Sequence, residues 1–134
     1  MPNPDYDRAI EKARPMLAWT FDWDGEGAQP IDPAAWEEAT ALGRLICREA
    51  HCPAPSFGAC NDGSLDLWWH SPSAESDRNH WSLLINVPVG GPMAMYGLSP
   101  NSTIKSGNIN PAMDADWIAA WLIARPLPER NTAS

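Results

Sequence analysis

The chain has 134 residues, of which 44% are hydrophobic and 19% charged, with 17 Asp and Glu residues against 9 Lys and Arg residues. This length predicts one domain over residues 1–134, large enough to bury a core without disulfide bonds. The net charge of -8 disfavours direct binding of nucleic acid, whose phosphates it repels. No stretch approaches the ~20 apolar residues of a membrane span, and residues 1–18 lack a signal-peptide pattern, so we expect a cytoplasmic protein, of a bacterial cell or a phage-infected host, that does not bind membranes.

A helix and an acidic loop are predicted to make up residues 1–30. The spacing of apolar residues predicts a helix over Asp5–Arg14, which Pro15 ends. The apolar segment Met16–Phe21 then predicts either a short strand or an irregular packing segment. Trp23 begins the acidic loop, and we expect its side chain to fold onto the core.

An acidic stretch without any Lys or Arg lies between Arg14 and Arg44. We predict that a basic protein partner contacts five of its carboxylates, those of Asp22, Asp24, Glu26, Glu37 and Glu38. The alternative is an acidic surface that only keeps the protein soluble. The first three carboxylates also occupy positions one, three and five of a calcium-loop pattern, but position twelve is Pro33 instead of a bidentate Glu. We therefore expect no calcium there.

A second helix, predicted over residues 33–50, begins with a clear capping signal. Asp32 is placed to cap it, and Pro33 occupies the first helical position, where its missing N–H costs nothing. Apolar and small residues recur at steps of three and four, which predicts a stripe that faces a sheet and consists of Trp36, Ala39, Leu42, Gly43, Ile46 and Ala50. The segment Pro53–Pro55 is predicted as an extended linker.

A half-buried antiparallel hairpin over Asp62–Val87 is the feature around which we expect the rest of the chain to pack. Side chains of a strand point alternately to its two faces. The residues predicted for the buried face are Leu65, Leu67, Trp69, Trp81, Leu83, Ile85 and Val87. The opposite face is mostly polar, but it also carries Trp68 and Leu84.

Two further strands and a helix are predicted after the hairpin. Met93–Leu98 predicts a third strand, and Ile104–Ile109 predicts a short fourth strand at the edge of the sheet. A second asparagine–proline capping signal at Asn110 begins a final helix that ends before Pro126. Residues 127–134 are predicted to be a frayed tail.

Together these elements predict an α+β fold, in which two or three helices cover an antiparallel meander sheet of three to four strands. If the helices share one face of the sheet, Trp68 and Leu84 form an apolar patch on the other. Such a patch indicates a partner, a homo-oligomer contact or cover from the N-terminal segment. It is the alternative to the acidic stretch as the partner-binding surface.

Cys47, His51, Cys52 and Cys60 are candidate ligands of a zinc site. Structural zinc sites usually have paired ligands separated by two to four residues at each end, and this spacing is missing here. An odd number of cysteines also argues against a closed disulfide framework. We therefore expect free thiols, no stoichiometric metal and no cofactor.

His70 and His80 flank the hairpin turn, where residues of neighbouring strands meet. With Asp66 and Asp77 they suggest an acid–base or metal pair. No serine nearby has the sequence setting of an activated nucleophile. We therefore predict no catalytic residue.

Two local motifs occur together in this chain. One is WDGEGAQPI at residues 23–31, ahead of a helix, and the other is PAP at residues 53–55 followed by DGSLDLWW at residues 62–69. The combination resembles a recurrent group of small bacterial and phage proteins with a WDG-x-x-A-x-P loop, a helix, a P-x-P linker and a DG-x-x-x-L-x-W strand. The resemblance covers about residues 19–98. It implies the same architecture and a bacterial or mobile-element origin, but no activity and no site residue.

Three classes of function follow from these observations. The first is a small acidic non-catalytic protein-binding module, such as a phage or mobile-element inhibitor of a basic host defence protein (anti-CRISPR-like). The second is an accessory or antitoxin-like protein that neutralises a co-encoded partner through the sheet face. The third is a small enzyme that uses His70 and His80. The lack of a catalytic motif favours the first two classes.

Overall fold

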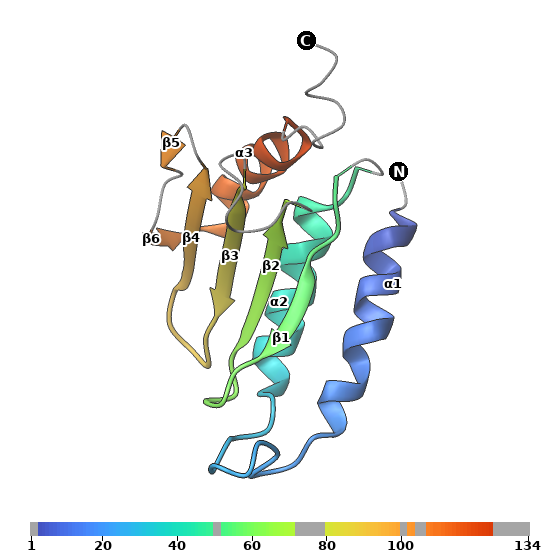
Figure 1. Cartoon of the computed structure of the whole chain (residues 1–134), viewed down its shortest axis with the longest axis vertical. Helices are drawn as coiled ribbons and strands as arrows, with labels where there is room; N and C mark the ends of the chain where they lie inside the picture. The colour runs from blue at the N-terminus through green and yellow to red at the C-terminus, as the bar shows by residue number, and fades with distance from the viewer. Residues whose placement is uncertain (1–2, 50–51, 72–79, 100–101, 104–106, 125–134) are drawn as a thin grey trace.

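The structure, a computed structural model, describes residues 3–49, 52–71, 80–99, 102–103 and 107–124. It confirms the predicted α+β class, because helices pack on one antiparallel sheet (Figure 1). The helical segments are α1 (Pro4–Ala13), the 3₁₀ helix η1 (Arg14–Ala18), α2 (Pro33–Ile46) and α3 (Pro111–Ala124). The strands are β1 (Ser56–Ala59), β2 (Leu65–His70), β3 (Ser82–Val87), β4 (Met93–Ser99), β5 (Ser102–Thr103) and β6 (Gly107–Ile109).

The sheet is a meander in the order β1-β2-β3-β4-β5, and β6 also pairs with β4. Strands β2 and β3 form the predicted hairpin in the register that alternation requires, with Leu67 opposite Ile85 and Trp68 opposite Leu84. This register sends the apolar set of both strands to the same face.

Two strand predictions need correction. Strand β1 is missing from the sequence prediction: after Pro55 the chain continues as an edge strand paired with β2. Of the fourth strand predicted over residues 104–109, the structure shows β6 at residues 107–109, and residues 104–106 lie outside the described part of the chain.

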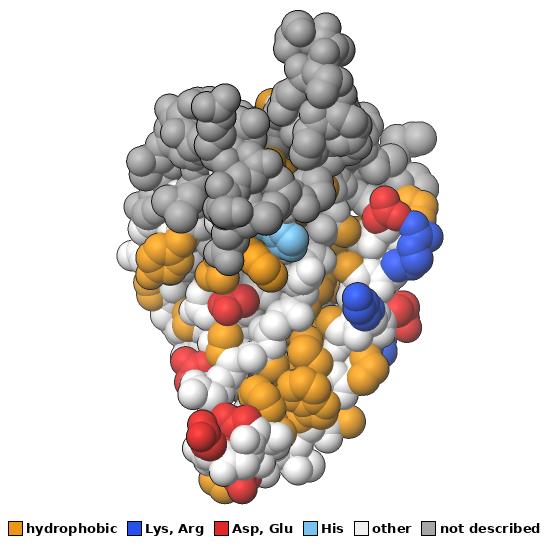
Figure 2. Space-filling model, in the orientation of Figure 1, with side chains coloured by type: hydrophobic (Ala, Val, Ile, Leu, Met, Phe, Trp, Pro, Cys, Tyr) orange, Lys and Arg blue, Asp and Glu red, His pale blue; other side chains and the backbone are white. Residues whose placement is uncertain are grey.

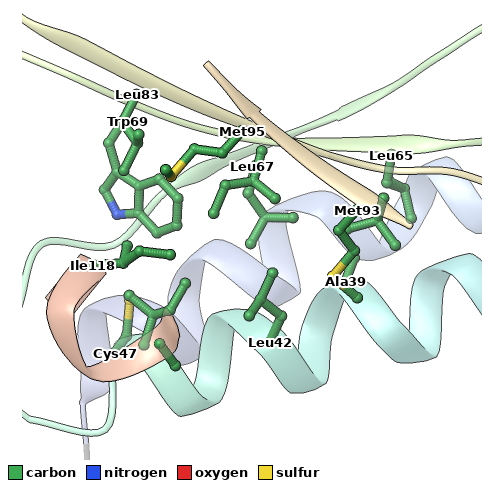
Figure 3. Packing of buried hydrophobic residues seen from close by; sticks show 14 of the residues in the cluster. Ala39, Leu42, Cys47, Leu65, Leu67, Trp69, Leu83, Met93, Met95 and Ile118 are labelled. Atoms are coloured by element: carbon green, nitrogen blue, oxygen red, sulfur yellow. The ribbon is translucent and has the colours of Figure 1, made fainter. Parts of the chain in front are cut away.

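The core lies between the sheet and its helices. Figure 1 shows α2 and α3 behind the sheet, and α1 runs beside the edge strand β1. The predicted core residues Trp69, Trp81 and Leu83 are buried. Figure 3 shows Leu42 of α2 and Ile118 of α3 on the helix side of this layer, facing the sheet residues. Since each buried large apolar side chain contributes about 1.5–3 kcal/mol, this layer supplies the main stabilising term.

Helix α2 begins where the sequence predicts but ends earlier. Asp32 caps it, with Oδ2 accepting a hydrogen bond from Ala35 N at 3.0 Å. The helix ends at Ile46 instead of residue 50, because the Asn3 side chain binds the chain that follows. Its Nδ2 donates to the carbonyl oxygens of Cys47, Glu49 and Cys52 at 2.9, 2.9 and 3.1 Å. These carbonyls point to Asn3 and not along a helix axis.

Helix α1 confirms the first helical prediction and is locked onto α2 by one tyrosine. Asn3 Oδ1 caps α1 by accepting from Tyr6 N at 3.1 Å. The buried Tyr6 donates its hydroxyl proton to Thr40 O at 2.6 Å, and its ring occupies the space where Gly43 has no side chain. After α1 the chain forms η1, so the strand alternative for Met16–Phe21 is wrong.

Candidate protein-binding surfaces

A compact loop joins η1 to α2, and its own backbone binds two of the predicted contact carboxylates. Asp22 Oδ1 accepts a hydrogen bond from Gly27 N, and Asp24 Oδ1 accepts from Glu26 N at 2.8 Å and from Ala28 N at 3.1 Å. Asp22 has a φ of +67°, a left-handed conformation that Asp adopts more readily than most residues. The two aspartates therefore shape the loop, and the second oxygen of each makes no hydrogen bond within the described chain.

The turn between β1 and β2 anchors this loop. Gln29 N donates to Asn61 O at 2.8 Å, and Asp32 N donates to Gly63 O at 3.0 Å. Gly63 has a φ of +91°, and a Cβ there would lie 3.1 Å from Pro30 O, so only glycine fits this contact without strain. Both motifs of the sequence resemblance thus meet at one end of the molecule.

Asp62 adds a further carboxylate at the tip of this turn. Hydrogen bonds from the Ser64 hydroxyl at 2.6 Å and the Ser64 backbone N–H at 3.0 Å lower the pKa of Asp62. Both donors favour the charged form, so Asp62 is ionised at neutral pH.

The loop and the β1–β2 turn bring Asp22, Asp24, Glu26 and Asp62 to one end of the molecule, and Glu37 and Glu38 follow in the first two turns of α2. We call these six carboxylates the acidic end. All six residues are exposed. Figure 2 shows carboxylates at the lower end of the molecule, whereas the visible Lys and Arg side chains lie higher, on the side of α1. Within the described chain none of the six forms an ion pair, and the four ion pairs found there involve Arg8, Arg14, Arg44 and Arg48 instead. No Lys or Arg of the described ranges is therefore paired with a carboxylate of this end.

Three aromatic side chains share the acidic end, and we call them the aromatic patch: Trp19, Phe21 and Trp23. Trp19 is 41% exposed and Phe21 is 61% exposed. The ring centroids of Trp19 and Trp23 are 4.8 Å apart, and Trp23 Nε1 donates to Gln29 O at 2.7 Å. The prediction that Trp23 folds onto the core is wrong, because a loop carbonyl binds its indole N–H and Trp19 packs on its ring. Sequence analysis missed Trp19 and Phe21, although they precede the acidic residues directly.

The predicted apolar patch of Trp68 and Leu84 also exists, on the sheet face opposite the helices, which we call the open sheet face. Cross-strand pairing places Leu84 opposite both Trp68 on β2 and Tyr96 on β4, so the three side chains form one row. Trp68 is 43% exposed and Tyr96 is 59% exposed. Sequence analysis missed Tyr96, which the period of two in the third predicted strand could have placed on the same face as Leu84 but not beside it. No helix of the described chain covers this face (Figure 1).

The two histidines lie near each other, with ring centroids 6.5 Å apart. His70 stacks on Trp68 at 4.3 Å and donates Nδ1–H to Ser71 O at 2.8 Å. The Ser71 hydroxyl lies 3.0 Å from His80 Nδ1 and accepts a hydrogen bond from Trp81 N at 3.1 Å. Ser71 is only 2% exposed. These contacts join the end of β2 to the residues that precede β3.

Of the two acidic residues predicted beside the histidines, the structure describes Asp66. Asp66 accepts a hydrogen bond from Asn86 Nδ2 at 2.9 Å, one that ties β2 to β3. Asp77 lies outside the described residues. The structure thus brings the two histidines near each other and ties Asp66 to Asn86.

Cys47 and Cys52 are buried, and Cys47 Sγ donates to Pro53 O at 3.4 Å. The neighbouring Cys52 thiol and burial raise the pKa of Cys47, so the thiol stays protonated and unreactive. Cys60 lies apart from them, near Asn86, and His51 lies outside the described residues. The described His, Cys, Asp and Glu side chains form no group of three that could hold a metal ion.

Cys60 gives a direct test of the environment at the end of β1. Burial raises the pKa of Cys60 to about 11. Because only the thiolate reacts, we expect alkylation by iodoacetamide at about pH 8 to be roughly 100-fold slower than that of an exposed thiol, and to accelerate as the pH rises towards the folded-state pKa. Mass spectrometry of the alkylated peptide measures this rate. Alkylation as fast as in the urea-unfolded chain would contradict the placement of Cys60.

No helix of the described chain is long and apolar enough to cross a membrane. No protein-family model, no curated protein and no solved structure matches the chain. The resemblance to the group of small bacterial and phage proteins therefore stays a prediction that rests on its two motifs.

Proposed function

We propose that this protein is a small non-catalytic protein-binding module whose acidic end takes a basic protein partner, such as a basic host defence protein that it inhibits. The observation that carries the proposal is the uncompensated charge: six exposed carboxylates at one end have no cation paired with them in the described chain. The arginines of α1 and α2, by contrast, are each paired with a carboxylate.

Physical chemistry links this arrangement to a basic partner. Charge of one sign at one end of a protein steers an oppositely charged partner into contact and raises the association rate. Exposed charges are screened over ~8 Å at physiological ionic strength, so the attraction weakens as salt is added. The same charge repels nucleic-acid phosphates, which supports a protein as the partner.

Affinity capture from a lysate of the native host tests the proposal with three forms of the protein. The first is the wild type and the second is Glu26→Lys/Glu37→Lys, which reverses two carboxylates of the acidic end. The third, Glu49→Lys/Asp116→Lys, makes the same change in net charge at exposed positions near the opposite end of α2.

We expect the wild type and the control variant to capture the same basic protein, and the acidic-end variant to lose it. The captured protein, purified, should then bind the wild type directly. Capture of an acidic protein, or equal capture by all three forms, contradicts the proposal.

The open sheet face supports a second candidate function, an accessory or antitoxin-like protein that neutralises a co-encoded partner. The supporting observation is the exposed row of Trp68, Leu84 and Tyr96, which lie in register on three neighbouring strands. In that case Tyr96→Lys should abolish neutralisation in a growth assay, while Glu26→Lys/Glu37→Lys should leave it unchanged. The opposite pattern assigns binding to the acidic end.

A further inference from the structure

Resting on the proposed function, we infer that the acidic end binds arginine side chains of its partner in preference to lysine, through the aromatic patch together with the adjoining carboxylates. This end combines aromatic and acidic side chains. Trp19 and Phe21 expose large aromatic surfaces, and Asp22, Asp24 and Glu26 follow them directly in a compact loop. Figure 2 shows apolar side chains beside carboxylates at this end of the molecule.

The loop is ordered by its own hydrogen bonds, which include those that its backbone donates to one oxygen each of Asp22 and Asp24. Asp22 N donates to Ala28 O at 2.6 Å and Gly25 N donates to Asp22 O at 3.0 Å. The Trp23 indole N–H is bound to a loop carbonyl and its ring packs against Trp19, so the exposed surfaces of Trp19 and Phe21 are the part of the patch that a partner can contact. The exposed aromatic rings and the second carboxylate oxygens of Asp22 and Asp24 are thus available together to a partner.

A guanidinium group fits both halves of this surface. It stacks on an aromatic face and donates two parallel hydrogen bonds to a carboxylate, and it is more weakly hydrated than an ammonium group. Lysine offers a compact, strongly hydrated charge that gains less from the rings. Charge alone therefore predicts equal binding of arginine and lysine, whereas the aromatic patch predicts a preference.

One arginine of this chain already binds between an aromatic ring and a carboxylate. The Arg44 guanidinium carbon lies 5.2 Å from the Tyr6 ring centroid, and Arg44 Nη1 lies 3.3 Å from Asp7 Oδ1. An arginine is thus held between an aromatic face and a carboxylate within the described structure. At the acidic end the aromatic rings and carboxylates are present, but no cation of the described chain is paired with those carboxylates.

The test uses nona-arginine and nona-lysine peptides as probes, with affinities measured by isothermal titration calorimetry at about 50 mM salt, where screening is weak. We expect the wild type to bind nona-arginine about fivefold more tightly than nona-lysine. The variants Trp19→Ala and Phe21→Ala should each reduce this preference and leave the affinity for nona-lysine unchanged within about twofold. Both positions are exposed and outside the core, so the melting temperature should be retained.

Tyr96→Ala is the matched control, because Tyr96 is exposed to a similar extent but lies on the open sheet face. It should keep the full preference for arginine. Equal affinity for the two peptides, or a preference that survives loss of Trp19 and Phe21 or disappears with Tyr96, overturns this inference alone. Failure of both peptides to bind in a salt-dependent way contradicts the proposed function itself, and this inference with it.

Discussion

Replacing Trp69 with Ala should cost about 3–5 kcal/mol of unfolding free energy, the largest effect we expect from a single substitution in this chain. Trp69 is 2% exposed, and its indole N–H donates to Pro53 O at 2.8 Å. Figure 3 shows its ring between Leu83 and Ile118, where truncation leaves a cavity between the sheet and α3. The free energy of unfolding of a small domain is only ~5–15 kcal/mol, so the variant should lose a large part of its stability.

Chemical denaturation followed by circular dichroism measures this loss. The matched control is Trp68→Ala, at the next position of β2, where the side chain is 43% exposed and points to the open sheet face. We expect it to cost less than about 1 kcal/mol. If the two substitutions had equal effects, or the order were reversed, the assignment of the two faces of β2 would be wrong.

Asn3→Ala should cost about 2–4 kcal/mol, because one side chain performs two structural tasks. The buried Asn3 caps α1 through Oδ1 and holds the carbonyls of Cys47, Glu49 and Cys52 through Nδ2. Its removal leaves an uncapped helix and carbonyl groups without their donor. The melting temperature reports the loss.

Asn3→Asp separates the two tasks. An aspartate still caps α1, but it presents a carboxylate oxygen to the three carbonyls in place of the amide donor. We therefore expect Asn3→Asp to be destabilised by at least as much as Asn3→Ala. A stable Asn3→Asp variant would show that only the helix cap matters and that the carbonyl contacts are dispensable.

Local signals predicted much of the fold. Alternation fixed the faces of β2 and β3, since a slip of one residue would expose Leu65, Leu67 and Trp69 together. Asp32 followed by proline correctly marked the start of α2. Both signals lie within a few residues of sequence, which is why they are readable without the tertiary structure.

The features that the sequence did not predict depend on contacts between distant segments. Ser56-Phe57-Gly58-Ala59 lacks strand periodicity and becomes β1 only by pairing with β2. The end of α2 depends on Asn3, which lies more than forty residues earlier in the chain. A local helix pattern that continues to Ala50 contains no information about this contact.

The candidate surfaces were predicted only in part, because they too depend on contacts between distant segments. The carboxylates of residues 22–38 are visible as a run of charge, but Asp62 joins them only because the β1–β2 turn anchors the loop. Trp68 and Leu84 follow from alternation within one hairpin, whereas Tyr96 joins their row only through the register of β4. The aromatic patch depends on how the loop folds back, which no periodic pattern describes.

The association rate between this protein and its captured partner, measured by stopped-flow fluorescence at rising salt, tests the central claim most directly. We predict that Glu26→Lys/Glu37→Lys slows association about tenfold at low salt and reduces its salt dependence, while Glu49→Lys/Asp116→Lys changes it less. All forms should stay close to the wild-type melting temperature, since these side chains are exposed and the one ion pair lost, Asp116 with Arg48, is a surface pair worth about 0–1 kcal/mol. A partner whose association rate and affinity change with neither the salt concentration nor the charge reversals would contradict the claim. The acidic end would then be only a solubilising surface.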